Sequence, residues 1–180
     1  MSVEEKEKPL TAVLSKGTVL VLDEKAKELH EQGYYGELVD EKKIILTPLE
    51  ALFLLERGRI EVFDENGKKL SFQELMRYFS SKDPDIMSNF IVYRDLRTRG
   101  YVVRPGIEGA AEFRLYERGS KNKDKVAKYL IKTFCEGMSL SLTELDKLST
   151  LARNLGKELV LAIVDRQGDT TYYKVSRVEL

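Results

Sequence analysis

Residues 93–116, which read YRDLRTRGYVVRPGIEGAAEFRLY, decide how this chain folds. The first letters complete a helix that we predict over residues 85–99 and that Gly100 ends. Apolar residues recur three or four positions apart along the buried face of this helix: Ile86, Phe90, Tyr93 and Leu96. The rest of the segment predicts a short strand, a glycine-containing loop and a second strand that reaches Tyr116.

Upstream of this segment, the sequence SSKDP at residues 80–84 predicts a domain boundary, because it is polar and its Asp-Pro pair breaks regular structure. We therefore expect two domains, residues 1–83 and 84–180. Strand and helix patterns alternate in the first one. They predict a hairpin or broken strand at 11–22, a helix at 24–32 capped by Asp23, strands at 43–46 and 59–63, and helices opened by capping boxes at Thr47 and Ser71.

Downstream of the segment, a polar loop at 117–125 precedes a predicted strand at 126–135. A capping box at Ser141 opens a helix whose apolar face carries Leu142, Leu145, Leu148, Ala152 and Leu155. Residues 158–165 are nearly all apolar, which is typical of a strand buried on both faces, and a turn then leads to a last strand at 170–178. The predicted fold class is α+β, with an N-terminal α+β domain and a C-terminal domain in which helices flank a small mixed sheet.

The charge balance limits the classes of function. Thirty basic and thirty acidic residues give a formal net charge of zero, which argues against coating nucleic acid by bulk charge but allows a local basic patch. The single cysteine, Cys135, allows no internal disulfide, and its apolar neighbours predict a small core residue rather than a nucleophile. The charged N-terminus lacks the apolar core of a signal peptide, and no apolar run has the length of a membrane span, so we expect a cytoplasmic protein.

The segment at 93–116 resembles the core of the archaeal tRNA-splicing endonucleases, whose pattern is close to VYxDLRxxGYxVxxG, a small loop and FxxY. The matching residues are Val92, Tyr93, Asp95, Leu96, Arg97, Gly100, Tyr101, Val103, Gly106, Phe113 and Tyr116. The resemblance implies the family's two-domain arrangement, with an α/β nuclease-like C-terminal domain. It also implies RNA cleavage without a metal or another cofactor, in which the ribose 2′-hydroxyl attacks the neighbouring phosphate. That reaction needs a base, an acid and a cation.

The resemblance implies a catalytic tyrosine, histidine and lysine. The tyrosine position falls at Tyr116 and the lysine position at Lys157, although a strand tyrosine and a lysine after a helix also have ordinary structural explanations. The histidine position holds Val126, which cannot transfer a proton. The only histidine is His30, in the predicted N-terminal helix, where we expect a surface residue. The missing acid favours a non-catalytic relative.

In this family, some enzymes are built from two catalytic and two structural subunits. The resemblance therefore implies a structural subunit that supports a catalytic partner on precursor tRNA at bulge-helix-bulge motifs, or that forms a dimer alone. The assembly loop would be residues 165–169, with Asp169 and Asp165 as docking charges, and the strand after it resembles the family's dimerisation segment. An ordinary hairpin turn is the alternative for the loop. The alternatives for the whole chain are a self-sufficient homo-oligomeric nuclease and a binding module without a role in splicing.

Arginines cluster around the same segment and are candidates for RNA contact. They are Arg94, Arg97, Arg99 and Arg104, and we expect Arg114 and Arg118 to join them across the sheet. Alternatively, Arg94 and Arg97 pair with Asp95 or Asp85 on the helix. Tyr34 and Tyr35 lie beside glycines, and we expect them to cover the core of their domain rather than to stack on RNA bases.

Overall fold

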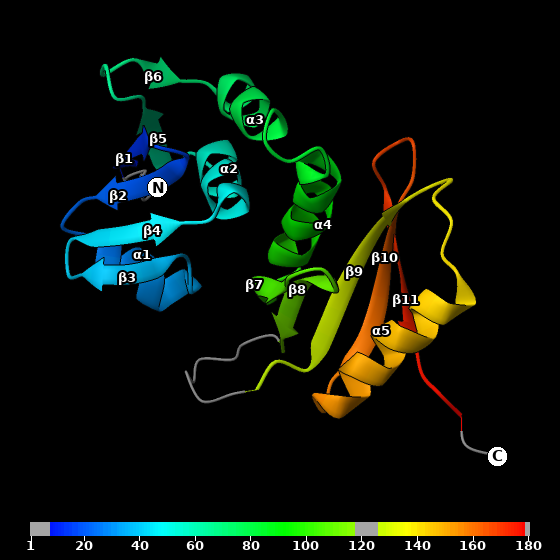
Figure 1. Cartoon of the computed structure of the whole chain (residues 1–180). Coiled ribbons are helices and arrows are strands. Elements are labelled where there is room, and N and C mark those ends of the chain that lie inside the picture. Colours follow the sequence, from blue (N-terminus) through cyan, green and yellow to red (C-terminus); the bar gives the residue numbers. More distant parts are fainter. Residues whose placement is uncertain (1–7, 118–125, 179–180) are drawn as a thin grey trace, which may run out of the picture. The chain divides into compact units, whose positions relative to one another are not determined.

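The computed structural model describes residues 8–117 and 126–178 (Figure 1). The chain divides into two compact units, Met1–Met87 and Ser88–Leu180. Each unit has its own sheet and its own core, so each is described by itself.

The first unit contains a six-stranded sheet in the order β3-β4-β2-β1-β5-β6. Neighbouring strands are antiparallel except for β1 and β5, which pair in parallel. The strands are β1 (Leu10–Ser15), β2 (Thr18–Leu22), β3 (Glu37–Asp40), β4 (Lys43–Leu46), β5 (Ile60–Phe63) and β6 (Lys69–Leu70). The helices are α1 (Ala26–Gly33), α2 (Pro48–Glu56) and α3 (Phe72–Ser80).

The predicted capping boxes at Thr47 and Ser71 are confirmed, since each side chain accepts from the backbone of a glutamate three residues on and that glutamate reaches back. The prediction for Asp23 was wrong. The N-cap of α1 is Lys25, and the Asp23 carboxylate instead accepts from the Lys25 backbone at 2.9 Å. The sequence patterns also missed β3 and β6, because β3 is exposed along its whole length and β6 has only two residues.

Of the tyrosine pair at residues 34 and 35, only Tyr35 lies in the core as predicted, whereas Tyr34 is half-buried. Tyr35 is buried and stacks on Phe53 of α2, with 6.4 Å between the ring centroids. Tyr34 takes a left-handed conformation, with a φ of 56°, at the C-cap of α1. This segment thus closes α1 against α2 and the sheet.

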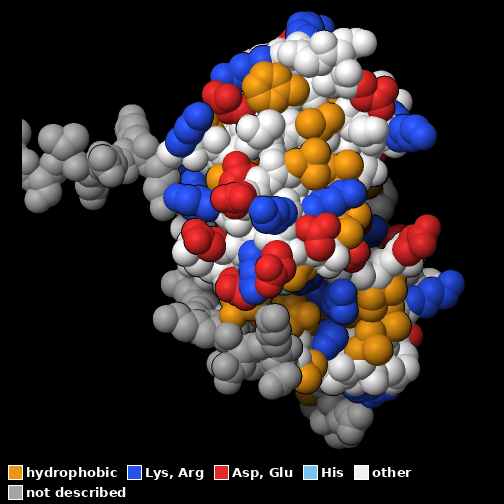
Figure 2. Space-filling view, turned by 90° about the vertical axis from the view of Figure 1, so that its left-hand side faces the viewer, with side chains coloured by type: hydrophobic (Ala, Val, Ile, Leu, Met, Phe, Trp, Pro, Cys, Tyr) orange, Lys and Arg blue, Asp and Glu red, His pale blue; other side chains and the backbone are white. Residues whose placement is uncertain are grey.

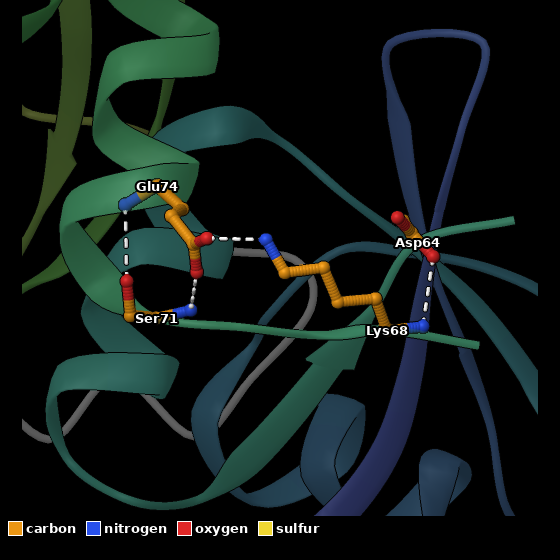
Figure 3. A network of polar contacts seen from close by, with 4 residues as sticks. All are labelled: Asp64, Lys68, Ser71 and Glu74. Atoms are coloured by element: carbon orange, nitrogen blue, oxygen red, sulfur yellow. Dashed lines mark hydrogen bonds and ion pairs between the residues drawn. The ribbon is translucent and has the colours of Figure 1, made fainter. Parts of the chain in front are cut away.

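A network of polar contacts joins the β5–β6 hairpin to the start of α3 (Figure 3). Lys68 donates to Glu74 at 2.6 Å, and Glu74 also accepts from the Ser71 backbone at 2.9 Å. Asp64 accepts from the Lys68 backbone at 2.8 Å, which closes the hairpin. The hydrogen bond between Lys68 and Glu74 therefore links the capping box of α3 to the hairpin that precedes it.

The second unit contains a five-stranded sheet in the order β11-β10-β9-β8-β7. β9 and β10 are parallel, and the other pairs are antiparallel. The strands are β7 (Val102–Ile107), β8 (Ala111–Tyr116), β9 (Tyr129–Cys135), β10 (Glu158–Val164) and β11 (Thr170–Val175), and the helices are α4 (Ile86–Thr98) and α5 (Leu142–Asn154).

The two helices of this unit lie on opposite faces of its sheet (Figure 1). On one face, Tyr93 of α4 lies over Phe113 of β8, with 6.1 Å between ring centroids. On the other face, Leu148 and Ala152 of α5 pack with Leu159 and Leu161 of β10. The predicted mixed sheet flanked by helices is confirmed, and the apolar run at 158–164 forms an interior strand.

Four predictions about burial or extent in this unit were wrong. Leu142 and Leu155 lie at the two ends of α5, beyond the sheet that its middle covers, and are 83% and 42% exposed. Cys135 is exposed because it is the last residue of β9, past the core. The strand predicted from residue 126 begins at Tyr129, and the strand predicted to reach residue 178 ends at Val175.

The surface agrees with the even charge balance. Figure 2 shows acidic and basic side chains interspersed on one face of the molecule, with hydrophobic side chains between them. Within the described ranges, no helix has the length and apolar character needed to cross a membrane.

Candidate functional site

Three positions far apart in sequence meet at one end of the second unit's sheet. Tyr116 ends β8, Val126 precedes β9, and Lys157 comes directly before β10. β8 runs antiparallel to β9, and β9 runs parallel to β10. The C-terminal end of β8 and the N-terminal ends of β9 and β10 therefore lie at the same end of the sheet. The Lys128 amide donates to the Leu115 carbonyl at 2.9 Å, which holds these strand ends level.

Lys157 is held in place by the segment that contains the histidine position. Its ammonium donates to the Ala127 carbonyl at 2.9 Å, and the side chain is half-buried. Gly156, which precedes it, adopts a φ of 64° as the chain leaves α5 for β10. The Lys157 ammonium is thus fixed at the end of the sheet where β8 finishes at Tyr116.

At this end of the sheet, the described residues include no histidine, the side chain that ordinarily donates protons near neutral pH. The Val126 side chain is 76% exposed. Lys128 forms an ion pair with Glu117 at 2.9 Å. The hydrogen bond to Glu117, followed by one to Tyr129, raises the pKa of Lys128 above the ordinary lysine value, which makes this ammonium a weaker acid.

His30 lies in the first unit and serves the fold there. It is half-buried, not the surface residue that we predicted, and its Nδ1 lies 2.9 Å from the Tyr35 carbonyl oxygen. Tyr34 donates its backbone N–H to the His30 carbonyl at 2.8 Å. His30 is thus part of the turn that ends α1.

A groove of about 560 Å³ opens beside Lys157, between the C-terminal half of α5 and the end of β11. Its lining includes four basic residues: Arg153, Lys157, Lys174 and Arg177. Lys174 pairs with Glu158 at 2.7 Å, and Arg177 lies 4.0 Å from Asp146. Sequence reasoning missed three of these residues, because no local motif links α5 to the end of β11. Their proximity becomes visible only when α5 lies against β10 and the end of β11.

The predicted RNA-binding arginines fall into different environments. Arg104 and Arg114 are direct cross-strand partners on β7 and β8, whereas Arg97 lies on α4 and donates to the Tyr101 carbonyl at 3.3 Å. Arg118 lies outside the described residues. Of the other two arginines in the cluster, Arg99 pairs with Asp95 at 2.8 Å, and the Arg94 guanidinium lies 5.7 Å from the Phe90 ring centroid.

The two aspartates of the predicted assembly loop have different surroundings. The Asp165 carboxylate accepts from the backbones of Gln167 and Asp169, both at 2.9 Å, and therefore shapes the turn. Asp169 is exposed, and no group in the described part of the chain pairs with its carboxylate. The loop follows β10, so it lies at the opposite end of the sheet from Tyr116 and Lys157.

Comparison with known proteins gives matches to both units. Residues 86–172 match the family model "tRNA intron endonuclease, catalytic C-terminal domain", and residues 10–76 match "tRNA intron endonuclease, N-terminal domain". The chain is 36% identical to proteins named tRNA-splicing endonuclease from Methanococcus vannielii, over 96% of this chain and 97% of the relative, and from Pyrococcus horikoshii, over 96% and 98%. It is 38% identical to a longer tRNA-splicing endonuclease from Methanococcoides burtonii, of which it spans 47%. With both domains matched in order over most of its length, this chain belongs to the tRNA-splicing endonuclease family.

Proposed function

We propose that this chain is the structural subunit of a tRNA-splicing endonuclease that removes introns from precursor tRNA at bulge-helix-bulge motifs in the cytoplasm. It supports a catalytic partner in a two-plus-two assembly. The observation that carries the proposal is the exposed Val126 at the position of the family's histidine, next to a retained Tyr116 and Lys157. Loss of a general acid costs about 10²–10⁴ in rate.

The surroundings of the site support this proposal. Lys128 is the basic side chain nearest in sequence to Val126 among the described residues, and its raised pKa disfavours proton donation at neutral pH. His30 lies in the other unit, where its Nδ1 contacts the Tyr35 carbonyl oxygen. Tyr116 and Lys157 can therefore bind or orient RNA, but the set for proton transfer is incomplete.

Two features support an assembled enzyme. The exposed Asp169 suits docking on a basic surface of another subunit, and β11 is an edge strand of the sheet that the described residues form, a position that suits pairing with a partner chain. The relative from Methanococcoides burtonii is about twice as long as this chain, which is compatible with two such chains working together.

The test is cleavage of a bulge-helix-bulge RNA by the pure chain, with and without a catalytic subunit of the family, in buffer with chelator. Cleavage only in the mixture supports the structural subunit. Cleavage by the pure chain at a wild-type-like rate contradicts it and favours a self-sufficient homo-oligomeric enzyme with an atypical site. Failure to bind either the subunit or the RNA favours a binding module without a role in splicing.

Tyr116 provides a sharper form of the test. The variant Tyr116→Phe in this chain should leave the cleavage rate of the assembled enzyme nearly unchanged, because the chemistry resides in the partner. The same substitution at the partner's tyrosine serves as the matched control. A loss of about 10²-fold from Tyr116→Phe here, the size expected for an acid–base group, would refute the proposal.

A further inference from the structure

The groove between the C-terminal half of α5 and the end of β11 is cationic as well as concave. Among the described residues that line it, four carry basic side chains and one, Glu158, carries an acidic side chain. Asp146, which lies outside the lining, adds a second carboxylate 4.0 Å from Arg177. The basic side chains outnumber these two carboxylates, so the groove attracts an anion.

Two of the basic side chains form ion pairs that remain open to solvent. The Lys174 and Glu158 side chains are 58% and 36% exposed, and the Arg177 and Asp146 side chains are 55% and 66% exposed. Exposed pairs of this kind contribute little to stability, so a phosphate can compete for the two cations. Neither cation is buried, so a rearranged pair leaves no unpaired charge in the interior.

Lys157 supplies a fixed positive charge where the groove meets the candidate site. Its ammonium donates to the Ala127 carbonyl oxygen at 2.9 Å, and its side chain is half-buried. An ammonium has three donors, so this hydrogen bond leaves others for the oxygens of a ligand. Because the fold already holds the side chain, binding an anion there restricts little additional motion.

The uncharged part of the lining suits the ribose and the base of a nucleotide. Ser149 and Ser176 bring hydroxyl groups from α5 and from the segment after β11, and hydroxyls bind phosphate and sugar oxygens. Ala152, Leu159 and Val175 add apolar surface. The volume of about 560 Å³ falls in the range of roughly 300–1,000 Å³ that small-ligand sites occupy. A nucleotide-sized group therefore fits the groove in both size and chemistry.

The position of the groove favours RNA over an acidic protein segment as the occupant. Lys157 lines the groove, and Tyr116 ends β8 at the same end of the sheet. The candidate assembly loop, residues 165–169, follows β10 at the opposite end. An RNA strand that passes Tyr116 carries a phosphate on every nucleotide, so it can continue into the groove.

We propose that this groove binds a nucleotide of the substrate RNA beyond the strand segment at Tyr116, and that Lys174 and Arg177 hold its phosphate. This inference rests on the proposed function, since it places the RNA on this subunit. It extends the RNA contact from the end of β8 to the end of β11, with Lys157 between the two. Lys174 and Arg177 lie outside the arginine cluster that the sequence predicts.

The experiment measures binding of a bulge-helix-bulge RNA to the full chain by fluorescence anisotropy at several salt concentrations. The variant that combines Lys174→Ala with Arg177→Ala should weaken binding roughly tenfold, because the phosphate loses two charged donors. It should also reduce the slope of log K against log salt by about 0.7, the contribution of one phosphate on a single strand. Conversely, Glu158→Gln should strengthen binding roughly threefold, because it removes the carboxylate that competes for Lys174.

Lys147→Ala is the matched control, since it removes an exposed basic side chain from α5 outside the groove lining. It should change neither the affinity nor the slope. Thermal unfolding shows that each variant is folded. Assembly with the catalytic subunit is measured by sedimentation for the same variants and should be unchanged.

The inference is overturned if the double variant binds RNA like the wild type, or if Glu158→Gln fails to strengthen binding. It is overturned as well if the double variant loses assembly while RNA binding by the pure chain persists, because the groove then docks an acidic protein segment. A wild-type chain that assembles but has no affinity of its own for the RNA also overturns this inference. In these cases the proposed function survives. A wild-type chain that binds neither the RNA nor a catalytic subunit overturns the proposed function and this inference together.

Discussion

At the scale of single residues, a buried carboxylate organises the first unit. Glu50 is 1% exposed and accepts from the Gly36 backbone at 3.0 Å, the Thr47 backbone at 2.8 Å and the Thr47 hydroxyl at 3.0 Å. Gly36 itself has a φ of 65°, and a Cβ there would lie 2.5 Å from the Ile45 carbonyl oxygen. One side chain thus caps α2 and holds the turn before β3, which requires glycine at residue 36.

Glu50→Ala should destabilise the protein by about 2–4 kcal/mol, because it leaves buried donors without a partner. Urea unfolding measures the change. Glu31→Ala, at an exposed position of α1, is the control and should stay within about 0.5 kcal/mol of the wild type. Equal effects of the two substitutions would show that Glu50 does not carry this role.

At the scale of elements, α4 holds the edge strand of the second sheet. The Tyr172 hydroxyl of β11 donates to Asp95 of α4 at 2.7 Å, and Arg99 donates to the same carboxylate oxygen at 2.8 Å. Burial, followed by the hydrogen bond to Asp95, raises the pKa of Tyr172 above the ordinary tyrosine range, so this phenol remains a donor. Asp95 belongs to the sequence motif around which the fold is built, and here it has a structural role.

Tyr172→Phe should lower the free energy of unfolding by about 1 kcal/mol and speed amide exchange in β11, because the strand loses its bond to α4. Tyr173→Phe is the matched control, since Tyr173 is the next residue and is 57% exposed. Exchange in β11 that is equally slow in both variants would contradict the anchoring role.

The capping box of α3 should respond to acid. The hydrogen bond from Lys68, followed by those from Ser71, lowers the pKa of Glu74 to about 2. A carboxyl whose folded pKa lies below its unfolded value, about 4.3, stabilises the fold above that value and loses the contribution as pH falls toward 2. Between pH 5 and pH 2, the free energy of unfolding should therefore fall more steeply in the wild type than in Glu74→Gln. Parallel curves would show that the cap is not linked to this titration.

At the scale of the whole molecule, the proposed function would give separate tasks to the two ends of the second sheet. The candidate RNA site lies where β8 ends and β10 begins, and the candidate assembly loop lies where β10 ends. Substitutions at one end should therefore leave the other function intact. This separation allows assembly and RNA binding to be tested independently.

Asp169→Ala should weaken assembly with the catalytic subunit without changing thermal stability, because its carboxylate is exposed and has no partner in the described part of the chain. Sedimentation at low concentration measures the assembly. Gln167→Ala is the control within the same loop, since the Gln167 side chain is exposed and carries no charge. An unchanged mass for Asp169→Ala would count against the docking role.

Local patterns were enough for most elements of both units. Capping boxes, apolar periodicity and turn residues placed α2, α3, α4 and β10, because these signals act within a few residues of one another. The family motif also predicts the tyrosine position at Tyr116, the lysine position at Lys157 and the histidine position at Val126, and these assignments stay predictions. Exposed or very short strands such as β3 and β6 carry no such pattern, so they were missed.

Burial at the ends of elements and the composition of each surface depended on tertiary structure. The apolar Leu142 and Cys135 are exposed because the sheet does not extend beneath them, which no local pattern records. The pairing of Arg104 with Arg114, the groove lined by Arg153 and Lys174, and the different roles of Asp165 and Asp169 follow from strand register and turn geometry. Sequence alone determined the family, because family membership depends on residue identity, and the missing acid at Val126 stays a prediction from the same sequence. Only the folded sheet decided which charges lie together, because register brings distant residues to one face.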